Sequence, residues 1–118
     1  AELNEAAANI GAEAMAFDVT DAKVARAALE DIAARHGKLD VLVNNAAEQH
    51  TCDDVKDIPA AQVERTFRTN IFGYIFMAKA ARPHLGRGSS IINTASVAAV
   101  SCFSERFRIT TSRQRAIA

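Results

Sequence analysis

Apolar residues recur with helical spacing in the first forty residues. Residues 1–10 are rich in the helix formers alanine and glutamate, and Gly11 follows where a glycine would close the helix. A second pattern begins after Thr20 and Asp21, either of which can cap a helix, and stops at Gly37. Its apolar residues share one face, namely Ala25, Ala28, Leu29, Ile32 and Ala33. We therefore predict two helices.

A third helical pattern begins at Pro59 and ends at Pro83 and Gly86. Its apolar residues again lie on one face of the predicted long helix, as Val63, Phe67, Ile71, Tyr74, Ile75 and Ala78. Tyr74, the single tyrosine of the chain, is expected to be a core residue of this helix.

Three short segments between the helical patterns have the length and composition of strands: Ala14–Val19, Leu39–Val43 and Ser90–Asn93. The run from Leu39 to Val43 is typical of a strand with both sheet faces covered. Strands that alternate with helices indicate parallel βα units. The predicted class is therefore α/β.

Length and composition indicate one small globular domain of 118 residues, with 49% hydrophobic and 24% charged residues. Fourteen basic and fourteen acidic side chains cancel, so no overall field favours nucleic acid or an anionic membrane. The most apolar run, Ile71–Ala81, contains Lys79 and is too short to span a bilayer. Cys52 and Cys102 lack a CxxC or histidine-rich context, which predicts reduced thiols, no metal site and a cytoplasmic protein.

The pattern is lost beyond Val100. Residues 101–118 carry arginines, serines and threonines without periodicity, so we divide the chain into a domain at 1–100 and an aberrant basic tail at 101–118. A solvated tail is favoured over a phosphate-binding one. A change of reading frame near Val100 is a further hypothesis.

Polar side chains follow the predicted strands. Asp18, Asn44 and Ser96 lie at or just after strand ends, where ligands bind in a doubly wound sheet. Asparagines at such ends can hydrogen-bond the neighbouring backbone and hold a loop open. The alternative for the Asn44-Asn45 pair is an Asx-type turn without a ligand.

Four motifs in order resemble the short-chain dehydrogenase/reductase family, over about Ala1 to Val100. They are Asp18-Val19, Asn44-Asn45-Ala46-Ala47, Asn70 within Thr69–Phe72, and Ser96 within Ile91–Val97. The resemblance implies a partial Rossmann-like, doubly wound parallel sheet, NAD or NADP as cofactor, an alcohol or carbonyl substrate, and dimerisation through the long helix. It also implies that the strands at 39–43 and 90–93 are direct parallel neighbours.

The resemblance also implies a role for each motif. Asp18 would accept a hydrogen bond from the adenine amino group, beside the Val19 backbone. The turn from Asn44 to Ala47, including Asn45 and Ala46, would pack against the adenosine ribose and brace the sheet, although the family usually has glycine where Ala47 stands.

Two further residues would serve the chemistry. Asn70 would interrupt its helix and hold a water of the proton relay, and Ser96 would hydrogen-bond the substrate and steady the catalytic tyrosine.

The family's Tyr-x-x-x-Lys pair is absent. The family spacing reaches Ile109 and Arg113 instead, and isoleucine has no proton to donate. Tyr74 has its nearest following lysine five residues on, at Lys79. The Gly-rich phosphate turn and two strands would precede Ala1, which leaves the 14–19 strand without a neighbour.

We therefore expect an NAD(P)-dependent oxidoreductase present as a truncated chain without turnover of its own. The alternative is a non-catalytic protein that binds nucleotide or dimerises. A hydrolase that uses Ser96 is disfavoured because the chain has no G-x-S-x-G elbow.

Overall fold

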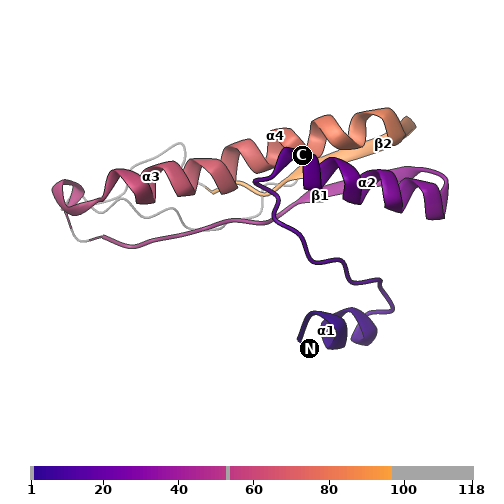
Figure 1. Ribbon diagram of the computed structural model, residues 1–118, viewed down its shortest axis with the longest axis horizontal. Coiled ribbons are helices and arrows are strands. Elements are labelled where there is room, and N and C mark those ends of the chain that lie inside the picture. The colour runs from indigo at the N-terminus through magenta and orange to yellow at the C-terminus, as the bar shows by residue number, and fades with distance from the viewer. Residues whose placement is uncertain (1, 53, 97–118) are drawn as a thin grey trace.

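The computed structural model describes residues 2–52 and 54–96 (Figure 1). A long, nearly continuous helical rod (residues 60–81) runs beside a parallel pair of strands, and α2 (Ala22–His36) packs along the rod. The first helix, α1, stands apart at the end of an extended connection. The predicted tail at 101–118 and its boundary at Val100 lie outside the described residues.

Helix α1 (Glu2–Asn9) is held by local interactions and buries no residue. It closes with a Schellman motif: the Ala12 N–H donates to the Ala7 carbonyl at 2.9 Å, and the Gly11 N–H donates to Ala8 at 3.2 Å. Gly11 has a φ of +67°, which a side chain would disfavour. The predicted helix and its closing glycine are confirmed.

Helix α2 (Ala22–His36) begins where Asp21 caps it. One carboxylate oxygen accepts from the backbone N–H groups of Lys23 and Val24 at 2.9 and 3.1 Å. The helix ends at Gly37, which has a φ of +84°. Most of the predicted apolar stripe is buried, namely Ala25, Ala28, Leu29 and Ala33. The prediction of α2 is confirmed.

Strands β1 (Leu39–Asn44) and β2 (Leu85–Asn93) pair in parallel, with Leu42 opposite Ile91 and Asn44 opposite Asn93. The predicted adjacency of these strands and the α/β class are confirmed. β2 begins five residues earlier than predicted, because the chain enters the ladder directly after the short helix η3 (Arg82–His84).

The predicted strand at Ala14–Val19 is wrong: this segment forms no strand in the described structure. A strand needs a neighbour for its N–H and C=O groups, and the described sheet pairs only β1 with β2. The segment runs extended past the helices, and Phe17 and Val19 pack against the core.

The long helix predicted after Pro59 is confirmed as α3 (Ala60–Phe67), the π-helical turn η2 (Arg68–Phe72) and α4 (Gly73–Ala81). A single-turn helix, η1 (Val55–Asp57), precedes it. Gly73 lets α4 approach the 14–19 segment, because a Cβ there would lie 3.1 Å from Val19 Cγ2. Residue Tyr74 is half-buried.

The core lies between α2, α4 and one face of the sheet. It consists of Ala25, Leu29, Leu42, Met77 and Ala81. In the described residues the opposite sheet face is uncovered, since Val41 and Val43 are 54% and 57% exposed. The expectation that both faces of this strand are covered is therefore wrong here. None of the described helices is long and apolar enough to cross a membrane.

Candidate functional site

The carboxyl ends of β1 and β2 lie side by side and are joined by backbone and side-chain hydrogen bonds. The Thr94 N–H donates to the Asn44 carbonyl at 2.9 Å, which extends the ladder past the end of β2. The Thr94 hydroxyl donates to Asn45 Oδ1, also at 2.9 Å. Parallel pairing therefore brings the Asn44–Ala47 motif next to the segment that leads to Ser96. Ser96 itself is half-buried.

The Asn44 side chain is turned into the protein and is only 5% exposed. Its amide nitrogen donates to Asn93 Oδ1 at 2.9 Å and lies 3.5 Å from the Tyr74 carbonyl of α4. This amide thus ties β1, β2 and the long helix together. The surfaces of the motif that a ligand can reach are those of Asn45 and Ala46, which are exposed, and Ala47, which is half-buried.

Residue Tyr74 supports the same region from the helix. Its hydroxyl donates to the Thr94 carbonyl at 3.2 Å. The phenol therefore fixes the backbone just beyond β2. The prediction that Tyr74 is a core residue is wrong, because the side chain is half-buried and lies outside the core cluster, with its hydroxyl bound at the edge of the sheet.

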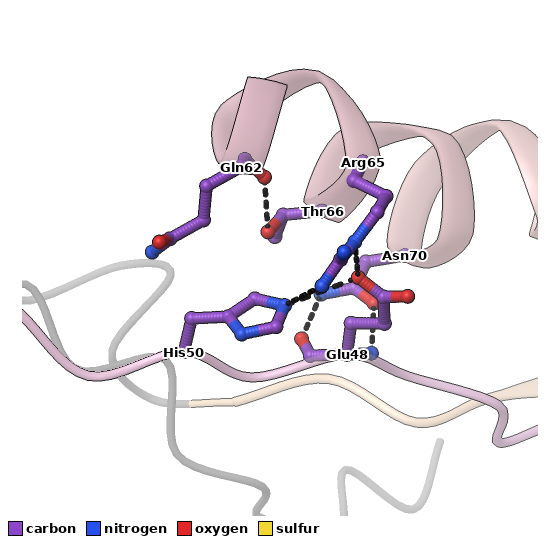
Figure 2. Close-up of polar contacts among 6 residues, drawn as sticks. All are labelled: Glu48, His50, Gln62, Arg65, Thr66 and Asn70. Carbon is purple, nitrogen blue, oxygen red and sulfur yellow. Dashed lines mark hydrogen bonds and ion pairs between the residues drawn. The ribbon is translucent and has the colours of Figure 1, made fainter. Parts of the chain in front are cut away.

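Asn70 lies in the π turn, and its side chain is hydrogen-bonded to the loop that follows β1 (Figure 2). Its Oδ1 accepts from the Glu48 backbone N–H at 2.8 Å, and its Nδ2 donates to the Glu48 carbonyl at 2.9 Å. π turns interrupt the regular helical hydrogen bonds and are frequent at functional sites. Asn70 is thus held against the motif that precedes Glu48 in the chain.

The Glu48 side chain makes a second contact with the same helix. Its Oε2 lies 3.1 Å from Arg65 Nε of α3 and 3.2 Å from His50 Nε2 (Figure 2). Hydrogen bonds to His50 and Arg65, together with their charges, hold the pKa of Glu48 below its ordinary value. Glu48, His50 and Arg65 were not among the site residues predicted from the sequence.

Asp18 follows the extended 14–19 segment at the start of α2. Its Oδ1 accepts from the Thr20 backbone N–H at 2.8 Å. Hydrogen bonds from Thr20 and the charge of Arg68 lower the pKa of Asp18, so the carboxylate is ionised at neutral pH. The side chain is exposed and has the acceptor chemistry that an exocyclic amino group requires. Val19, the next residue, packs against Gly73.

Metal chemistry has no candidate in this part of the chain. Across residues 2–52 and 54–96, no cluster of three or more His, Cys, Asp or Glu side chains could hold an ion.

Comparison with known proteins shows which family has this arrangement of strands and helices. A family model described as enoyl-(acyl carrier protein) reductase matches residues 1–113. A solved short-chain dehydrogenase from Streptomyces avermitilis superposes with a TM-score of 0.76 at 29% identity, over 86% of this chain and 39% of that one. The chain belongs to the short-chain dehydrogenase/reductase family. A second family structure, from Burkholderia cenocepacia in complex with NADP, has a TM-score of 0.75 at 29% identity and covers 84% of this chain and 41% of that one.

Curated relatives carry oxidoreductase names. The uncharacterized oxidoreductase YhdF of Bacillus subtilis is 50% identical over 82 residues, which are 70% of this chain and 28% of that protein. Glucose and ribitol dehydrogenase of Daucus carota is 57% identical over 61 residues, or 52% of this chain and 21% of that protein. This short-chain dehydrogenase/reductase chain therefore matches less than a third of the length of either relative.

Proposed function

We propose that this chain forms part of an NAD(P)-dependent oxidoreductase that interconverts an alcohol and a carbonyl compound. The observation that carries the proposal is the link between Asn70 and Glu48, with bonds of 2.8 and 2.9 Å. This link joins the π turn of the long helix to the strand-end motif of a short-chain dehydrogenase/reductase. Location in the cytoplasm is part of the proposal, on the ground that the cysteines lack a pairing motif.

The residues present fit the adenosine part of the cofactor. Asp18 offers an exposed, ionised acceptor for the adenine amino group, with Val19 next to it. Asn45, Ala46 and Ala47 offer small side chains and an exposed amide to the ribose, while the buried amide of Asn44 braces the floor beneath them.

The described residues do not fit the pyrophosphate. A helix N-terminus binds phosphate when its N–H groups are free. At α2 those of Lys23 and Val24 are taken by the Asp21 carboxylate, whose charge would also repel an anion. α3 begins at Ala60, after Pro59 and without a Gly-rich turn before it.

The proposed roles of the remaining site residues concern position rather than proton transfer. Asn70 would fix a water of the proton relay through the π turn, and Ser96 would orient the substrate oxygen at the carboxyl end of β2. The nicotinamide, when bound, supplies or accepts the hydride. Neither Asn70 nor Ser96 supplies an acid or base of suitable pKa for the reaction.

A chimera tests this function. Residues 18–96 would replace the equivalent segment of the carrot glucose and ribitol dehydrogenase, which provides the remainder of the fold. We expect a folded chimera with cofactor-dependent turnover. Asn70→Ala and Ser96→Ala should each lower kcat by about 10²-fold, as misplacement of reacting groups does.

Glu64→Gln is the matched control, because it changes an exposed polar residue of α3, and it should leave kcat unchanged. A folded chimera without turnover would contradict the proposal, as would an active one that tolerates both alanine variants.

The exposed apolar side of the long helix supports a second candidate function, dimerisation. The predicted stripe is largely uncovered, with exposures between 44% and 56% for Val63, Phe67, Ile71 and Ile75. A contiguous apolar surface of this kind on a helix is typical of a protein interface.

Sedimentation velocity across a range of concentrations tests the dimer. If the stripe forms the interface, Phe67→Asp should convert a dimer to a monomer. Val43→Asp is the matched control, since Val43 is equally exposed but lies on the sheet. A monomeric parent chain, or dissociation by the control alone, would exclude this use of the helix.

A further inference from the structure

Three charged or titratable side chains beside Asn70 are not used by the proposed chemistry. We call Glu48, His50 and Arg65 the Glu48 clamp. The side chains of Glu48 and His50 are 32% and 30% exposed, so both are partly withdrawn from water, whereas that of Arg65 is 61% exposed. They come from the loop after β1 and from α3 (Figure 2).

The clamp holds Glu48 at a second point. Asn70 binds the Glu48 backbone through both its N–H and its carbonyl. Arg65 Nε binds the Glu48 carboxylate at 3.1 Å from a position five residues earlier in the same helical rod. The backbone and side chain of one loop residue are thus fixed to two successive turns of one rod.

Arg65 is the constant partner in this clamp. His50 Nε2 lies 3.0 Å from Arg65 Nη2 and 3.2 Å from Glu48 Oε2. A guanidinium only donates and a carboxylate only accepts, so Nε2 can serve one of them at a time. Whether His50 Nε2 donates to Glu48 or accepts from Arg65, the bond from Arg65 Nε to the Glu48 carboxylate remains.

We propose that the Glu48 carboxylate and Arg65 are positioning residues for Asn70. Their ion pair holds the loop on α3, and the loop backbone in turn fixes the Asn70 side chain within the π turn. Without the pair, the two hydrogen bonds of Asn70 and the contact between His50 and Arg65 must hold this part of the loop. The functional meaning rests on the proposed function of Asn70, but the mechanical coupling does not.

Amide hydrogen exchange of the 118-residue chain, followed by NMR, tests the coupling without cofactor or substrate. The Glu48 N–H reports directly, because its partner is Asn70 Oδ1. We expect Glu48→Gln and Arg65→Gln each to accelerate its exchange about three- to fivefold, the scale of one partly exposed ion pair. The Asn70 side-chain NH₂ signals should shift in both variants.

Two variants serve as controls. Glu30→Gln breaks another ion pair, Arg26 Nε to Glu30 Oε1 at 2.7 Å on α2, and should leave the Glu48 N–H unchanged. Arg65→Lys keeps the charge and should preserve most of the protection. Core amides such as that of Leu42 report global opening.

An unchanged Glu48 N–H in the glutamine variants would overturn the positioning role, and so would an equal acceleration at Leu42. Neither result would bear on the proposed role of Asn70 itself, which the chimera experiment tests separately. Conversely, a chimera indifferent to Asn70→Ala would remove the functional meaning while the exchange coupling stood.

Discussion

The 118-residue chain is expected to show no cofactor-dependent oxidation or reduction of alcohols, sugars or ketones above background. Its only tyrosine, Tyr74, is followed four residues later by an alanine and not by the lysine of a Tyr-x-x-x-Lys pair. The Tyr74 hydroxyl donates a hydrogen bond to the Thr94 carbonyl. Loss of a positioned acid/base costs about 10²–10⁴ in rate. The pyrophosphate has no backbone cradle in the described residues, so the two deficits compound.

The assay would use chain purified from a host without related reductases, with NADH and NADPH followed at 340 nm in the ~millimolar substrate range typical of such enzymes. Calorimetry on the same sample should show weak or no binding of either nucleotide, because the described residues include no Gly-rich turn whose N–H groups would hold the diphosphate. Ile109→Tyr with Arg113→Lys, two positions outside the described residues, should not rescue turnover. Clear turnover by the unmodified chain, or micromolar binding, would contradict this reading.

A joint repair separates the two deficits. An N-terminal extension that supplies the Gly-rich turn and its two strands, combined with the tyrosine and lysine, should restore turnover. Each repair alone should fail, because one lacks the proton donor and the other lacks the phosphate site. Activity from the tyrosine and lysine alone would show that the adenosine contacts suffice for binding.

The sequence patterns correctly predicted the helices whose ends are set by nearby residues and whose apolar residues share one face. The stripe at Ala25, Leu29 and Ala33, with Asp21 before it and Gly37 after it, was enough for α2. The interruption expected at Asn70 is present as a π turn. Membership in the short-chain dehydrogenase/reductase family was also readable, because its motifs follow in order.

What the sequence could not predict depends on contacts between distant residues. The Ala14–Val19 segment has strand composition, but a strand forms only when a second strand pairs with it, and the described residues give this segment no partner. The Arg65–Glu48 pair spans 17 residues and the Asn70–Glu48 bonds span 22. No periodicity signals such contacts.

The exposure of the apolar stripe on the long helix could not be predicted for the same reason, since it depends on contacts with distant parts of the chain. Spacing showed that Val63, Phe67 and Ile75 share a face, but not which face meets the sheet. In the structure the buried positions are Gly73, Met77 and Ala81, a row of small and flexible residues along α4. Ala81 and Ala25 are both fully buried, so α2 and α4 approach closely only because these side chains are small.

The core that results is small, and Leu42→Ala is expected to have a large effect on the free energy of unfolding. Leu42 is 8% exposed and packs with Ala25, Leu29, Met77 and Ala81. Truncation of a buried leucine costs about 2–5 kcal/mol, from lost transfer energy and the cavity left behind. Small domains have a low free energy of unfolding. A large fraction of the Leu42→Ala variant should therefore be unfolded in water, before any urea is added. Urea unfolding followed by far-UV circular dichroism measures this cost.

Val43→Ala is the matched control for that experiment. Val43 is the next residue of β1 and is 57% exposed on the uncovered face. Its truncation removes β-branching but opens no cavity, so a cost below about 1 kcal/mol is expected. Equal costs at the two positions would show that β1 is not packed on α4 through Leu42. A larger cost at Val43 would show that the uncovered face is occupied in solution, by a second copy or by residues beyond those described.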